Sequence, residues 1–124
     1  MIQESIYNFL VSKTDLTAYV STRIYWSDAP QGSLYPQIVF KKLSAPKNYQ
    51  LDDEWQRWRF FIFDEDKFNV DAIATLLKGY LQNLYGTVDE DDIDFITRLD
   101  ESTIELRVED KINYMYIDFR VIYH

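Results

Sequence analysis

The sequence contains no cysteine, only three glycines, and a single histidine, His124, at its last position. Without cysteine there are no disulfides, no thiolate catalysis and no cysteine-ligated zinc. Three glycines leave little room for a backbone loop that cradles phosphates, and a terminal histidine is poorly placed for general acid or base work. We therefore expect no cofactor and no enzymatic activity.

Long apolar runs are also missing, since nowhere do 18 apolar residues follow one another. Residues 1–5 contain no basic segment of the kind that opens a secretory signal. Neither a membrane span nor export is expected, and a membrane partner is not expected either.

Aromatic residues, by contrast, are abundant at 17% of the 124 residues. A chain of this length fits one domain, residues 1–124, whose core does not readily absorb ten Tyr, eight Phe and three Trp. Ordinary strand positions account for about half of them, because aromatic residues suit pleated surfaces. The remainder favours contact with another protein, since aromatic side chains concentrate at the centres of interfaces.

Charge is distributed unevenly along the chain. The overall net charge is −8, but residues 1–63 carry +1 and residues 64–124 carry −9. Gripping the phosphates of a nucleic acid requires clustered Lys and Arg, so this balance argues against a nucleic-acid-binding protein.

Hydrophobic spacing predicts two kinds of element. Apolar residues recur at helical spacing over residues 2–13, in a short turn over 14–20, and over 69–85. Strand patterns cover residues 23–26, 36–43, 54–63, 93–99, 103–109 and 113–123. This order predicts an α+β fold, a two-layer sandwich in which helices pack on one face of a mainly antiparallel sheet.

The helix over residues 69–85 has the clearest pattern. We expect Asn69 to cap its N-terminus and Gly86 to close its C-terminus. Gly79 inside it costs about 1 kcal/mol relative to Ala, which indicates close packing at that point. The predicted buried stripe consists of Ile73, Leu77, Tyr80, Leu81 and Leu84.

Two neighbouring segments are candidates for a subunit or tail interface. The first lies in residues 44–53, a polar stretch expected to form a loop, and the second in the strand that follows. The candidate residues are Lys47, Asn48, Tyr49, Gln50, Trp55 and Trp58. Arg57 and Arg59 beside the tryptophans also fit a stacking platform for single-stranded nucleic acid, but acidic residues flank this segment on both sides.

A cluster of acidic residues follows the helix, formed by Asp89, Glu90, Asp91, Asp92 and Asp94. Clustered carboxylates suit hard cations, although this spacing lacks the alternating ligands and central glycine of an EF-hand loop. A solvated acidic turn is the favoured interpretation. A weak cation site and a functional negative patch are the alternatives.

The sequence resembles the tail-completion (tail-terminator) proteins of long-tailed bacteriophages and prophages. The resemblance begins with Arg-Ile-Tyr at residues 23–25, Ala-Pro-Gln-Gly at 29–32 and Leu-Tyr-Pro-Gln-Ile-Val-Phe at 34–40. It continues with residues 59–64, Tyr85-Gly86 and residues 118–123. The tryptophan pair and the acidic cluster depart from the family's pattern.

This resemblance implies a small structural protein that caps the finished tail tube as a hexameric ring and joins the tail to the head. Its partners would be other copies of itself, the tail tube protein and the head connector proteins. DNA would pass through the pore without sticking, because an acidic lining prevents the grip that basic residues create. The protein would be made in the cytoplasm of the host bacterium and reside in the virion, at the junction of tail and head.

Two other functions remain open. A monomeric adaptor or inhibitor would bind a host protein through Tyr49, Trp55 and Trp58. A metal-dependent hydrolase would use the acidic cluster at residues 89–94.

Overall fold

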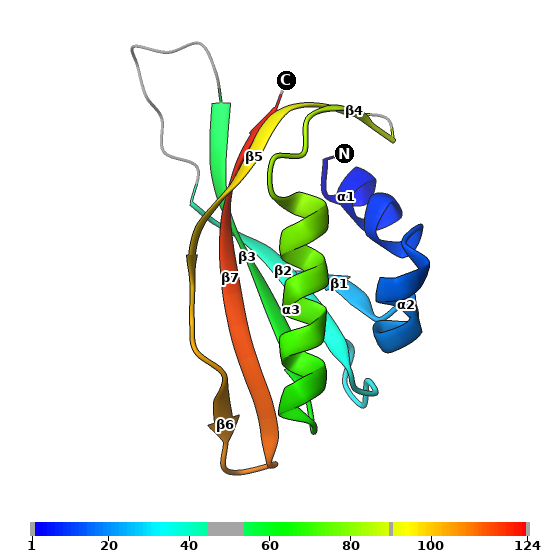
Figure 1. Ribbon diagram of the computed structural model, residues 1–124, viewed down its shortest axis with the longest axis vertical. Coiled ribbons are helices and arrows are strands. Elements are labelled where there is room, and N and C mark those ends of the chain that lie inside the picture. The colour runs from blue at the N-terminus through cyan, green and yellow to red at the C-terminus, as the bar shows by residue number, and fades with distance from the viewer. Residues whose placement is uncertain (1, 45–53, 90, 124) are drawn as a thin grey trace.

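The computed structural model describes residues 2–44, 54–89 and 91–123. Figure 1 shows a curled sheet with helices beside it. The helices are α1 (Ile2–Val11), α2 (Thr14–Val20) and α3 (Lys67–Leu81). The strands are β1 (Ile24–Trp26), β2 (Gln37–Ser44), β3 (Glu54–Asp64), β4 (Gly86–Val88), β5 (Asp91–Glu101), β6 (Glu105–Arg107) and β7 (Ile112–Tyr123).

The seven strands form one mixed sheet in the order β1-β2-β3-β7-β5-β4, with β6 paired to β7 beside β5. β1 and β2 are parallel, and the other pairs are antiparallel. The predicted α+β class is confirmed. The sheet is mainly antiparallel, with one parallel pair formed by β1 and β2, and it is curled, which the prediction of a two-layer sandwich did not include.

The helices lie on one face of this sheet (Figure 1). α3 packs against β3, β5 and β7, while α2 packs against α3 and α1 reaches β1 and β4. The strands supply alternate residues to this inner face, as the two-residue period of a strand requires. Trp58, Phe60 and Ile62 of β3 are buried in this way, opposite Phe119, Ile117 and Met115 of β7.

Helix α1 buries Ile2, Ile6 and Leu10, which recur at the predicted four-residue spacing. The predicted turn over residues 14–20 is α2, although its N-cap residue is Lys13 and makes no side-chain capping bond. Among the described residues, no helix is long and apolar enough to span a membrane.

Helix α3 buries three of the five predicted core residues, Ile73, Leu77 and Leu81, while Tyr80 and Leu84 are partly buried against the core. Its predicted ends are wrong. The N-cap is Asp66, whose carboxylate accepts from the Phe68 backbone N–H at 2.8 Å. Asn69 instead donates to Asp64 at 2.9 Å.

The C-terminus of α3 comes earlier than expected because the next residues pair with β5. Asn83, at φ 66°, donates its backbone N–H to the Ile96 carbonyl, and Ile96 donates back to Leu84. Gly86 therefore lies in β4, where it adopts a φ of 95°.

Gly79 does not mark close packing, because a Cβ at this position would meet no atom within 4 Å. We expect Gly79→Ala to raise the free energy of unfolding by about 0.5 to 1 kcal/mol, since alanine loses less backbone entropy in a helix. Urea denaturation would measure the gain. Gly86→Ala is the control, because its surroundings are equally open but its positive φ should make the same change destabilising. A loss of stability in Gly79→Ala would contradict the prediction.

Candidate functional site

The face of the sheet opposite the helices, called the outer face below, carries charged and aromatic side chains. On β3 these are Arg57, Arg59, Phe61 and Phe63, and on β7 they are Tyr114, Tyr116, Asp118 and Arg120. They occupy the positions that alternate with the buried residues of the inner face. No described helix packs on this side.

A buried carboxylate holds the centre of the outer face. Asp118 is fully buried and accepts hydrogen bonds from both Arg57 and Arg59. Arg57 Nη2 lies 2.6 Å from Asp118 Oδ2, and Arg59 Nε lies 2.7 Å from Oδ1. Burial alone would raise the pKa of Asp118, but the hydrogen bonds from Arg59 and Arg57 outweigh it and hold the pKa below its ordinary value. Asp118 therefore stays charged and fixes both arginines against the sheet.

Aromatic rings extend from this centre along the outer face. Phe61 and Phe63 stack with centroids 5.9 Å apart, and Tyr116 meets Phe61 edge-on at 6.2 Å. The Arg59 guanidinium lies 3.8 Å from the centroid of Tyr116, and the Lys41 ammonium lies 5.4 Å from that of Phe61. Rings that are half-buried and overlaid by cations combine apolar area with polar groups, as in the centres of protein interfaces.

A hollow of about 300 Å³ opens on the outer face beside these rings. Its lining comes from the loop after β1 and from outward-facing residues of β2 and β3. The lining residues are Ser27, Asp28, Ala29, Gln37, Val39, Lys41, Phe61 and Phe63. Gln37 is only 7% exposed, and its Oε1 atom has no hydrogen-bond partner within the described part of the chain. An unpaired acceptor that is buried in this way costs about 1 to 3 kcal/mol.

The structure describes only some of the residues that the sequence assigned to an interface. Lys47, Asn48, Tyr49 and Gln50 lie outside the described residues. For Trp55 the backbone alone is described, and it pairs with Ile122 in the sheet.

Trp58 is a core residue, and its expected exposure is wrong. Its side chain is 1% exposed. The centroid of its ring lies 5.3 Å from that of Trp26 and 5.9 Å from that of Phe40. Its indole N–H donates to Gln56 Oε1 at 2.7 Å. The physical reason is the strand period, because Trp58 shares its side of β3 with Phe60 and Ile62.

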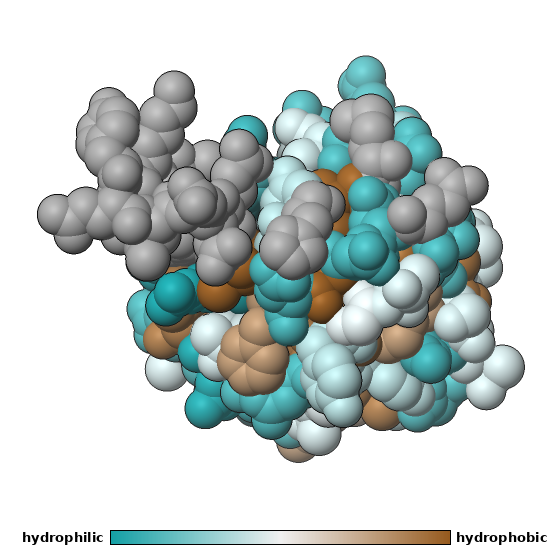
Figure 2. Space-filling view, turned by 90° about the horizontal axis from the view of Figure 1, so that it is seen from above, coloured by the Kyte–Doolittle hydropathy of each residue, from teal (hydrophilic) through white to brown (hydrophobic). Residues whose placement is uncertain are grey.

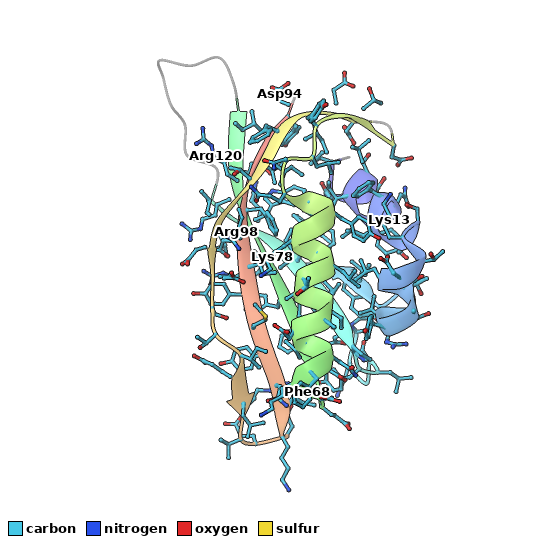
Figure 3. All side chains as sticks on the ribbon, viewed as in Figure 1. Lys13, Phe68, Lys78, Asp94, Arg98 and Arg120 are labelled. Carbon is cyan, nitrogen blue, oxygen red and sulfur yellow. The ribbon has the colours of Figure 1, made fainter. Side chains whose placement is uncertain are left out.

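The acidic cluster lies at the hairpin between β4 and β5, which is attached to α1. Ser5 Oγ donates to Asp91 at 2.6 Å, and Asn8 Nδ2 donates to Asp89 at 2.9 Å. Asp92 accepts from Thr87 at 2.7 Å. Asp94 lies further along β5 (Figure 3), and Glu90 is outside the described residues.

Asp89 and Asp92 are exposed, and each carboxylate also accepts one side-chain hydrogen bond. No group of three or more Asp, Glu or His side chains is placed to hold a metal ion in residues 2–44, 54–89 and 91–123. Figure 2 views this end of the molecule and shows mostly hydrophilic surface with small apolar patches between. Assignment of these acids to a pore stays a prediction.

A second polar contact joins the helix layer to the sheet. Glu101 accepts from Lys78 of α3 at 3.1 Å and from Arg98 of β5 at 3.0 Å, and Figure 3 shows Lys78 and Arg98 side by side. All three side chains are partly exposed, so this group contributes modestly to stability. We assign it a structural role in fixing α3 against β5.

No family model matches the chain, and no curated protein matches it. Among solved structures, a chain from the virion of a native gene transfer agent (GTA) particle has the same fold, with a TM-score of 0.74. The match covers 98% of this chain and 92% of the other, at 13% sequence identity. This identity is too low to transfer a role, so the comparison defines the shared architecture.

Sequence reasoning missed the outer face of the sheet. Its signal was present in residues 60–63, which are hydrophobic on both sides of the strand, and in the tyrosines at alternate positions 114 and 116. The sequence pattern does not reveal that β3 pairs with β7. This pairing places Arg59 directly opposite Asp118. The sequence separation of 59 residues hides this contact.

Proposed function

We propose that this chain is a structural protein of a tailed, phage-like particle that caps the tail tube as a hexameric ring and joins the tail to the head. The observation that carries the proposal is the fold shared with a chain of the GTA virion over 98% of this sequence. The motifs at residues 23–25, 29–32 and 34–40, which resemble tail-completion proteins, support the same assignment.

The outer face supports a role in assembly. A closed ring needs two different complementary surfaces on each subunit. The uncovered rings and arginines of β3 and β7 offer one such surface, with the composition typical of protein contacts. The proposal assigns the chain no catalytic activity. DNA passes through the ring, and the net charge of −8 disfavours its retention.

Deletion of the gene in the particle-producing strain tests this function. Electron microscopy should then show filled heads separate from tails, and tails of irregular length, because nothing stops tube growth or joins the parts. Expression of the chain from a plasmid should restore joined particles. Particles of normal length and connection in the deletion strain would contradict the proposal.

A monomeric adaptor is the second candidate, favoured by the high exposure of Phe68 and Tyr85. Burial of Trp58 removes one of the three aromatic residues that the sequence assigned to it. A protein that stays monomeric in the presence of purified tail tubes, and neither binds nor shortens them, would favour the adaptor.

A further inference from the structure

We draw no further inference here: the strongest candidate, the outer face of β3 and β7 with its half-buried aromatic rings and its arginines at 57 and 59, belongs to the site already described, and nothing in the part of the chain that the structure describes shows what covers it.

Discussion

Replacement of Asp118 by asparagine is expected to lower the free energy of unfolding by about 2 to 4 kcal/mol. The change leaves Arg57 and Arg59 next to each other without the carboxylate that both contact. Loss of one partner from a buried ion pair costs about 3 to 5 kcal/mol, and partial exposure of both arginines reduces that figure here. Urea denaturation at pH 7 would measure the loss.

Asp110→Asn is the matched control for this variant. Asp110 also contacts an arginine, Arg107, at 2.6 Å, but the pair is exposed, so its loss should be much smaller. Similar losses in the two variants would show that burial does not set the strength of the Asp118 contact.

The effect of Asp118→Asn should depend on pH. Because the pKa of Asp118 is lowered in the folded protein, its contribution is complete above the unfolded pKa of about 4 and is lost as the pH falls through the folded pKa. The difference in stability between the natural chain and the variant should therefore narrow as the pH falls from the unfolded pKa of about 4 through the lower folded pKa. A difference that stays constant from pH 7 to pH 2 would contradict the role of the charged carboxylate.

Leu77→Ala is expected to cost about 2 to 5 kcal/mol, the range for large-to-small changes in a packed core. Leu77 is fully buried where α3 lies on the sheet, so its truncation leaves a cavity in the centre of the molecule. Leu34→Ala makes the same chemical change at a highly exposed position and should have little effect. Denaturant melts that show a loss below about 0.5 kcal/mol for Leu77→Ala would mean that this residue does not support the core.

The sequence predicted the helices and most strands because each has a local period. Ile2, Ile6 and Leu10 recur as one helical face, and the last strand alternates Met115, Ile117 and Phe119 as one sheet face. Both faces are buried in the structure. Local spacing is sufficient for such elements because their period follows from backbone geometry.

Features set by long-range contacts were not predicted. The end of α3 depends on the backbone bonds of Asn83 and Leu84 with Ile96, which no local pattern reveals. The parallel pairing of Ile24 with Ile38 was not predicted either, because the spacing of hydrophobic residues does not show whether two strands run parallel or antiparallel. Trp58 was misplaced for a related reason, because composition indicates that some aromatics are exposed but not which ones.

The candidate site was predicted in part. The expectation of an aromatic protein-binding surface led to Trp58, one strand position away from the outward-facing Arg57 and Arg59. The orphaned Gln37 oxygen, in contrast, depends on the packing of β2 beneath the loop at residues 27–29. Only three-dimensional structure exposes such an unsatisfied atom.

The central position of β7 has a consequence for biosynthesis. This strand pairs with β3, β5 and β6, yet it is translated after all three of them. Until residues 112–123 emerge, the nascent chain holds β3 and β5 with unpaired edges and an uncovered apolar face. Fragments that stop before Ile112 should therefore aggregate instead of folding partly, and any translational stalling before residue 112 would expose the strand edges that promote misassembly.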